Sequence, residues 1–419
     1  MKKEKIKERA LIFLRKNINL LPREKNIGWK ETLLAVQHLV SAFGATTLVP
    51  LLTGFSVPVA LFTAGLGTLL FHLLTKQKVP IFLGSSFAFI PVIIIVAQTT
   101  GNLQYAQGGI VVAGLLYVLF SYIVHKVGVE NIAKIFVPHI IGTMIFIVGI
   151  TLIPVAIDMA AANWLIAGIV FTTAIFMQIF LKGFLKQMSI IVAIALGYVI
   201  SMFTVGVDAS GIVAANWIAV PTFTLPKFDV PSILVIAPVV LAVLMEHIGD
   251  ITANQTITGQ NYLKDPGLHR TLLGDGIATM AAGLLGGPAN TTYSENTGVL
   301  ALTGNYNPAI LRLAAVFAIV ISFIGKLSAV FATIPVFVLG GISLVLFGMI
   351  AMIGIKTLYK DQIWYSAEKL ICITLMLVVG LNAQLNITDT ISLSSMSLAA
   401  IVGVGFNILV TKARKIVSA

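Results

Sequence analysis

Long apolar runs, separated by short polar segments, cover almost the whole chain. A helix that crosses a bilayer needs about 20 mostly apolar residues, and fourteen runs approach or reach that length. The predicted spans are 30–53, 57–75, 80–98, 106–128, 131–155, 163–181 and 188–206, followed by 231–249, 271–287, 290–303, 307–327, 333–353, 366–381 and 393–411. Because a membrane barrel would alternate apolar and polar residues, the pattern predicts an all-α polytopic membrane protein of two seven-span halves.

The third span of each half is interrupted by small and hydroxyl-bearing residues, at 84–86 (Gly-Ser-Ser) and 290–292 (Asn-Thr-Thr). Such residues favour extended backbone, which at membrane depth is tolerated only inside protein or beside a water-filled cavity. We therefore expect a short strand and a half-helix in spans 3 and 10, with the half-helices beginning near Ser86 and Ser294 and the strands paired across a pseudo-two-fold axis. Matching breaks of this kind indicate a transporter's substrate site.

Composition and charge agree with these spans. The chain is 58% hydrophobic and 10% charged, whereas a soluble domain has roughly 25% charged residues. With a cytoplasmic N-terminus, 25 of the 27 Lys and Arg residues fall on the cytoplasmic side, the exceptions being Lys227 and Lys326, as the positive-inside rule requires. This rule accounts for the net charge of +11, and the chain has no basic groove or aromatic platform for nucleic acid. Both termini are predicted to be cytoplasmic.

Seven spans per half is an odd number, so the second half must enter the membrane in the opposite sense to the first, as in an inverted repeat. We expect a basic cytoplasmic segment (1–29), a first repeat (30–206), an external loop (207–230) and a second repeat (231–411). The external loop could form a short hairpin over the outer face. The basic segment could be an interfacial amphipathic helix or a solvated tail.

Four acidic residues remain within the predicted spans, where ionisable side chains are rare and mark functional sites. Glu246 and Asp250, spaced i, i+4 at the end of span eight, share one helix face. Asp275 opens span nine, and Glu295 follows the break in span ten. A buried carboxylate with no cationic partner favours its protonated form, a property that a proton-coupled carrier needs.

Packing roles for these residues are the alternative. Glu246 could be a neutral, hydrogen-bonded packing residue, and Asp275 could bond to His38 and hold span one against span nine. His247 faces away from the Glu246–Asp250 side and is expected to be structural. The sequence shows no cluster with metal-ligand spacing and no nucleophile–base pair, so we expect neither a metal, nor a cofactor, nor an enzyme.

Four motifs resemble the nucleobase–ascorbate transporter family, and the resemblance runs from about Trp29 to the last span. The motifs are Gln37-His38, the segment 84–89, Glu246-His247-Ile248-Gly249 and Glu295-Asn296-x-Gly298-x-x-x-x-Thr303-Gly304. In this family the first position of the last motif tends to be Glu in uracil carriers, Gln in xanthine and urate carriers, and Pro in ascorbate carriers. With Glu295 there, the chain is most similar to the bacterial uracil permeases.

The resemblance implies a core domain (30–128 and 231–327) and a gate domain (131–206 and 333–411). It implies import of a nucleobase, most simply uracil, by movement of the core against the gate. A proton gradient would drive this import in place of any cofactor. It also implies a multi-pass protein of the bacterial inner membrane, commonly a homodimer formed through gate helices.

The family pattern also implies roles for individual residues. The implied nucleobase-binding residues are Phe87, Glu246, Tyr293, Ser294, Glu295 and Phe347. Glu246 and Asp250 would couple protons, and His38, Asp275 and Asn296 would support the site. Independently of the family, carboxyl groups can accept the ring N–H groups of uracil, half-helix amides can meet its carbonyls, and an aromatic face can cover the ring.

Two positions depart from the uracil-permease pattern: Asp250 stands where those carriers usually have His, and Ser294 where they have Gly. Symport of xanthine or uric acid with protons is therefore one alternative. Anion exchange on the same inverted-repeat architecture is another, although Glu246 and Glu295 would repel an anion.

Overall fold

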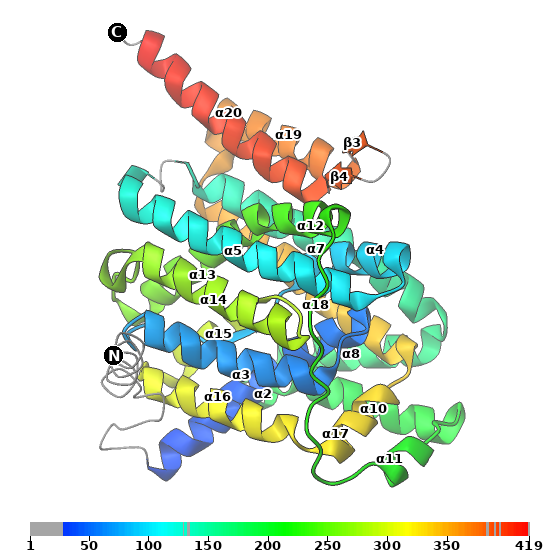
Figure 1. Ribbon diagram of the computed structural model, residues 1–419. Helices are drawn as coiled ribbons and strands as arrows, with labels where there is room; N and C mark the ends of the chain where they lie inside the picture. Colours follow the sequence, from blue (N-terminus) through cyan, green and yellow to red (C-terminus); the bar gives the residue numbers. More distant parts are fainter. Residues whose placement is uncertain are drawn as a thin grey trace, which may run out of the picture.

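The computed structural model describes residues 28–128, 130–131, 135–382, 385–388, 391–393 and 395–417. Most of the predicted basic segment 1–29 lies outside these ranges. Within them the protein is mainly helical (Figure 1), and seven helices are long and apolar enough to cross a membrane.

The described elements follow the fourteen predicted spans in order. The first half contains α2 (Trp29–Thr53), α3 (Val57–Leu74), β1 (Leu83–Ser85) with η1 (Phe87–Phe89) and α4 (Ile90–Thr100), α5 (Leu103–Val127), α7 (Pro138–Ala161), α8 (Trp164–Phe180) and α10 (Ser189–Thr204). The second contains α12 (Val230–Ile236), η2 (Ala237–Val239) and α13 (Val240–Thr258), α14 (Leu268–Leu285), β2 (Asn290–Thr292) with α15 (Ser294–Thr303), α16 (Pro308–Ser322), α18 (Val336–Lys360), α19 (Ala367–Asn382) and α20 (Ser395–Val417). Short connecting elements are α9 (Gly183–Gln187), α11 (Ser210–Ala214), η3 (Leu263–Gly267), α17 (Gly325–Ala332), η4 (Ile363–Tyr365), β3 (Leu385–Thr388) and β4 (Ile391–Leu393).

Several predicted spans are displaced, among them the fifth and the eighth. The fifth, predicted over 131–155, begins at Pro138, a residue whose fixed φ suits the first helical turn. The eighth, predicted to end at 249, continues to Thr258. Its last third looks like a loop on a hydropathy scale, but His247 and Asn254 are fully buried in protein. Glu246 and Asp250 therefore lie within helix α13 and not at its end.

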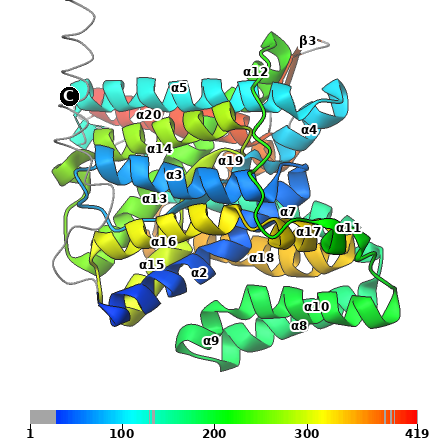
Figure 2. The same cartoon turned by 60° about the horizontal axis from the view of Figure 1, so that its bottom comes forward.

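The helices pack in pairs that repeat between the halves. Helix α3 packs on α16 as α14 packs on α5, and α8 packs on α10 as α19 packs on α20, while α7 and α18 pack on each other. Helices α3, α5, α14 and α16 form one stack, and α8, α9 and α10 lie apart from it beyond α18 (Figure 2). We keep the predicted names for these groups of helices, core for spans 1–4 and 8–11 and gate for spans 5–7 and 12–14.

The predicted strand pairing is confirmed. Strands β1 and β2 form an antiparallel pair whose Cα partners are Leu83 with Thr292, Gly84 with Thr291 and Ser85 with Asn290. The ladder is extended by the Ser86 N–H, which donates to the Ala289 carbonyl at 2.8 Å, and by the Tyr293 N–H, which donates to the Phe82 carbonyl at 3.0 Å. Every residue of both strands is buried, so the pair satisfies extended backbone inside the core, as a membrane interior requires.

The segment between the halves does not form the predicted hairpin. After α11 it runs as an extended strap over the helix ends of the core (Figure 1). The Ala219 N–H donates to the Phe323 carbonyl at 2.9 Å, and the Lys227 N–H donates to the Gln104 carbonyl at 2.9 Å. The hairpin prediction was wrong because these backbone donors are satisfied by core elements, not by a second strand of the same segment.

Candidate functional site

The first-half break brings an aromatic side chain to the boundary between core and gate. Phe87 follows β1 at the start of η1, and its ring meets that of Phe347 from α18 edge to face, with ring centroids 5.9 Å apart and an interplanar angle of 82°. Both rings are buried. Two residues predicted to face the substrate, one from each domain, are therefore in direct contact.

The second-half break is locked onto the first by Tyr293. Its hydroxyl donates to the carbonyl of Ser85 at 2.8 Å. A Cβ atom added to Gly84 would overlap the Tyr293 ring and the Thr46 hydroxyl, so only glycine permits this close approach. Helix α15 then begins at Ser294, with the amides of its first turn directly after the strand pair.

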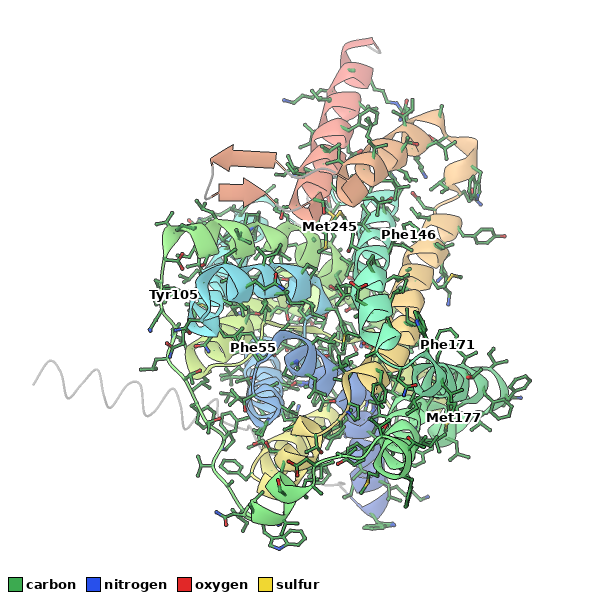
Figure 3. The ribbon with its side chains drawn as sticks, turned by 90° about the vertical axis from the view of Figure 1, so that its right-hand side faces the viewer. Phe55, Tyr105, Phe146, Phe171, Met177 and Met245 are labelled. Carbon is green, nitrogen blue, oxygen red and sulfur yellow. The ribbon has the colours of Figure 1, made fainter. Side chains whose placement is uncertain are left out.

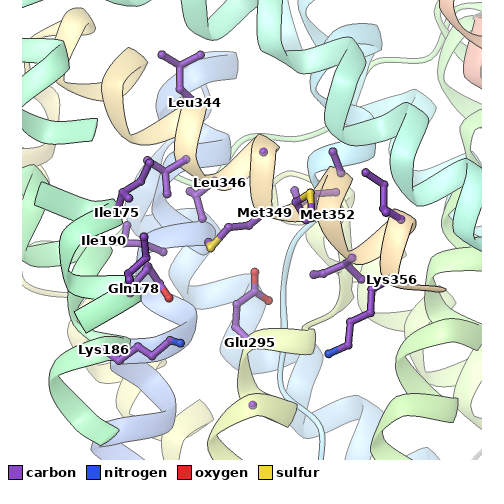
Figure 4. A pocket seen from close by; sticks show the side chains of 18 of the residues that line it. Ile175, Gln178, Lys186, Ile190, Glu295, Leu344, Leu346, Met349, Met352 and Lys356 are labelled. Carbon is purple, nitrogen blue, oxygen red and sulfur yellow. The ribbon is translucent and has the colours of Figure 1, made fainter. Parts of the chain in front are cut away.

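Glu295, in that first turn, points into a cavity of about 1060 Å³ between core and gate (Figure 4). Helices α2 and α15 of the core and α7, α8, α10 and α18 of the gate contribute its walls. The walls are mainly apolar, and Figure 3 shows two of their aromatic residues, Phe146 and Phe171, on the side opposite Tyr105 and Phe55 of the core. Among the described residues that line the cavity, Glu295 is the one acid.

Glu246 lies in α13 and is partly buried against the gate. It lines a small void of about 10 Å³ with Met144, Ile145 and Val148 of α7 and Ile350 of α18. Among the described residues, no group donates a hydrogen bond to its Oε2 atom. In this arrangement the oxygen is buried, and no described residue uses its hydrogen-bonding capacity.

Asp250 is held inside the core, one helical turn after Glu246. Its Oδ2 atom accepts a hydrogen bond from the Thr292 hydroxyl at 2.9 Å. The bond ties α13 to β2, so Asp250 connects the carboxylate-bearing helix to the strand pair.

The supporting residues form two separate networks. The amide of Asn296 donates to the His38 carbonyl at 2.9 Å and lies 3.1 Å from its Nδ1 atom, joining α15 to α2. Asp275 instead faces α13, where its Oδ2 atom is 3.0 Å from Nδ1 of His247. The alternative in which Asp275 bonds to His38 was therefore wrong, because the two side chains leave their helices toward different neighbours.

The sequence pattern predicted only a structural role for His247. A signal was present: Thr271 and Asp275 are polar residues four positions apart in an apolar span and so share one helix face. Both contact His247, since its Nε2 atom lies 2.9 Å from the Thr271 hydroxyl. The partner of that face could not be deduced without the helix packing.

The carboxyl groups of α13 and α15, the amides at the start of α15 and the aromatic ring of η1 lie in the region between core and gate, with Glu295 in the large cavity and Glu246 at a separate small void. Such a set can bind a flat polar molecule that carries both N–H donors and carbonyl acceptors.

Comparisons with known proteins agree on the family. A family model described as "Permease family" matches residues 29–388. A probable uracil permease of Haemophilus influenzae is 40% identical over 395 residues, which are 92% of this chain and 95% of that protein. The uracil permease of Bacillus caldolyticus is 38% identical over 393 residues (90% and 91%), and that of Escherichia coli is 36% identical over 389 residues (90% of each).

Solved structures share the fold at low identity. The transmembrane domain of the cyanobacterial bicarbonate transporter BicA superposes with a TM-score of 0.62 at 14% identity, covering 90% of this chain and 96% of that one. SLC26A9 gives a TM-score of 0.70 at 11% identity over 97% of this chain and 69% of that one. The structural likeness concerns the fold alone, whereas the sequence relatives are permeases. The chain is therefore a multi-pass membrane permease, not an enzyme, and belongs to the nucleobase–ascorbate transporter family.

Proposed function

We propose that this protein imports uracil together with protons across the bacterial inner membrane, with both termini in the cytoplasm. The observation that carries the proposal is the similarity to uracil permeases at 36–40% identity over about nine-tenths of the chain. Glu295 supports it, since it occupies the position where uracil carriers of this family tend to have Glu.

The site geometry suits this substrate. Uracil presents two N–H donors and two carbonyl acceptors in one plane. Glu246 and Glu295 accept from the N–H groups, the amides at the start of α15 meet a carbonyl, and Phe87 covers the ring. Stacking of one base on an aromatic ring is worth about 1–3 kcal/mol in nucleic-acid binders. An analogue without the N–H groups would leave buried acceptors unpaired and be rejected.

Proton coupling rests on Glu246 in this proposal. Its carboxyl group lies where α13 of the core meets α7 and α18 of the gate. A change in its charge therefore alters the free energy of the contact between core and gate. Protonation from outside neutralises the group and permits uracil to bind, and the core then moves against the gate. The large cavity reaches Lys186 and Lys356, both on the predicted cytoplasmic side, and corresponds to the inward-open arrangement.

Xanthine or uric acid is a second candidate substrate, which Asp250 favours. In uracil permeases this position is usually His, and here the carboxyl group accepts from Thr292 beside the strand pair. The variant Asp250→His should narrow the substrate range toward pyrimidines if this residue sets specificity.

The test is accumulation of radiolabelled uracil in cells that lack their own carriers, with and without a protonophore. Competition by thymine, xanthine and uric acid defines the substrate range. We expect uptake that the protonophore abolishes and that pyrimidines alone compete. Protonophore-sensitive uptake of xanthine or urate without uracil uptake would overturn the assignment of uracil, and uracil uptake that ignores the protonophore would overturn the coupling.

A further inference from the structure

A histidine–aspartate pair lies behind the site, away from the cavity. His247 of α13 and Asp275 of α14 both have fully buried side chains, and their Nδ1 and Oδ2 atoms are 3.0 Å apart. The other ring nitrogen of His247 is 2.9 Å from the Thr271 hydroxyl. Two hydrogen bonds of one imidazole therefore fasten α13 to a single face of α14.

The hydrogen bonds indicate where the protons lie. The Thr271 hydroxyl donates to the Leu268 carbonyl at 3.0 Å, and a hydroxyl has only one proton to donate. It must then accept from His247, so Nε2 carries a hydrogen. The contact between Nδ1 and Asp275 needs one further proton, which either atom can hold, and with that proton the pair is neutral overall.

Two observations favour the neutral pair. The Oδ1 atom of Asp275 is buried and has no hydrogen-bond partner among the described residues, whereas a buried carboxylate would require donors at both oxygens. Among the described residues, the ionisable groups that interact electrostatically with Asp275, besides His247, are Tyr117 of α5 and Glu246 and Asp250 of α13. None of these three is a cation that could balance a negative charge.

The pair fixes the direction of Glu246. Successive residues of an α-helix are about 100° apart around its axis. With His247 bound to α14, the neighbouring Glu246 must point away from that helix, and it lies against Met144 and Ile350 of the gate. A rotation of α13 large enough to withdraw Glu246 would break both bonds of His247.

We propose that His247 is a positioning residue: it shares one proton with Asp275 throughout the transport cycle, and this neutral pair holds Glu246 toward the substrate. The inference rests on the proposed function in taking uracil as the ligand. Glu246 and Asp275 then differ in role: Glu246 exchanges its proton during transport, whereas Asp275 and His247 keep theirs.

Two amide substitutions separate the two bonds of the imidazole. In His247→Asn the amide takes the place of Nδ1 and retains the contact with Asp275, whereas in His247→Gln it takes the place of Nε2 and retains only that with Thr271. Radiolabelled uracil binding to the purified full-length protein should weaken less than about threefold in the Asn variant. In the Gln variant it should weaken about tenfold or more, the equivalent of one lost buried hydrogen bond to a charged or acidic group.

A spectroscopic measurement tests the shared proton directly. Nitrogen NMR of the wild-type protein with labelled histidine should show a hydrogen on Nε2 of His247 and an Nδ1 signal between those of a protonated and an unprotonated ring nitrogen, as a proton shared with Asp275 requires. The variant His125→Gln removes an exposed histidine. Its spectrum identifies the His125 signal, and its uracil affinity serves as the control for the His247 variants. Folding of each variant is checked by thermal unfolding.

Two results would overturn the inference: uracil binding by His247→Gln that equals the wild type, or a His247 ring without a hydrogen on Nε2. Absence of uracil binding by the wild type would instead reject the proposed substrate, and the NMR measurement would still decide whether the proton is shared.

Discussion

The two halves of the protein share one order of elements but differ in chemistry. The four acids predicted to lie within spans all belong to the second half, and three of them are on α13 and α15, which face the gate or the cavity. The acids of the first repeat are Glu31, Glu130 and Asp158, none of which is buried. The first-half break is followed by Phe87 in the first turn after its strand, whereas the second is followed by Glu295.

The repeat therefore accounts for the common order of helices and strands in the two halves, whereas the buried acidic residues among those described belong to the second half alone. In the proposed transport cycle the first half provides Phe87 and the second half provides the carboxyl groups that would exchange protons. Changes of charge in the second half should therefore affect coupling, and changes of shape in the first half should affect binding.

The largest effect is expected for Glu246→Gln. The amide cannot take up and release a proton, so accumulation of uracil against its gradient should be abolished. Uptake in carrier-deficient cells measures this effect, with Glu130→Gln, an exposed acid of the first half, as the matched control. Normal accumulation by the Glu246→Gln variant would remove the functional distinction between the halves.

Gly84→Ala should have the next largest effect. The added methyl group overlaps the Tyr293 ring, and overpacking of a close contact costs about 1–3 kcal/mol, so uracil affinity should fall about 5- to 150-fold. Gly168→Ala is the control, because a Cβ at Gly168 of α8 meets nothing within 4 Å. Equal uracil affinities of the two variants would show that the close packing of Gly84 on Tyr293 does not affect substrate binding.

The variant Phe87→Leu tests the contribution of the aromatic ring to uracil binding without altering any charge. Loss of a stacking partner should lower uracil affinity about tenfold, in the lower part of the 1–3 kcal/mol range for one base on a ring. The dependence of uptake on the proton gradient should remain. A variant that binds uracil normally but no longer responds to a protonophore would assign coupling to the first half and contradict the comparison.

Much of this arrangement could be predicted from the sequence. The apolar runs gave the number and order of the spans, and the polar breaks gave both strands and their pairing. The eighth span was cut short at 249 because hydropathy cannot distinguish a polar helix end in water from one buried in protein, as at Asn254. The pairing of Asp275 with His247 depends on the rotation of α13 relative to α14, which residue spacing within one helix does not contain.

The smallest effect is expected for Tyr293→Phe, which removes one hydrogen bond between the halves, to the Ser85 carbonyl. A typical buried hydrogen bond contributes about 1 kcal/mol, so uracil affinity should fall about fivefold. Equilibrium binding of labelled uracil measures this change. A loss as large as that of Gly84→Ala would mean that the hydroxyl contacts the substrate and does more than join the two breaks.

The strand pair also limits how this site can vary during evolution. Each strand has three residues, and side chains in a strand alternate between its two faces. Insertion or deletion of one residue in β1 would exchange the faces and place Leu83 or Ser85 beneath the Tyr293 ring in place of Gly84. Lineages descended from this protein should therefore differ here by substitution, and changes of length should accumulate in the loops outside the membrane.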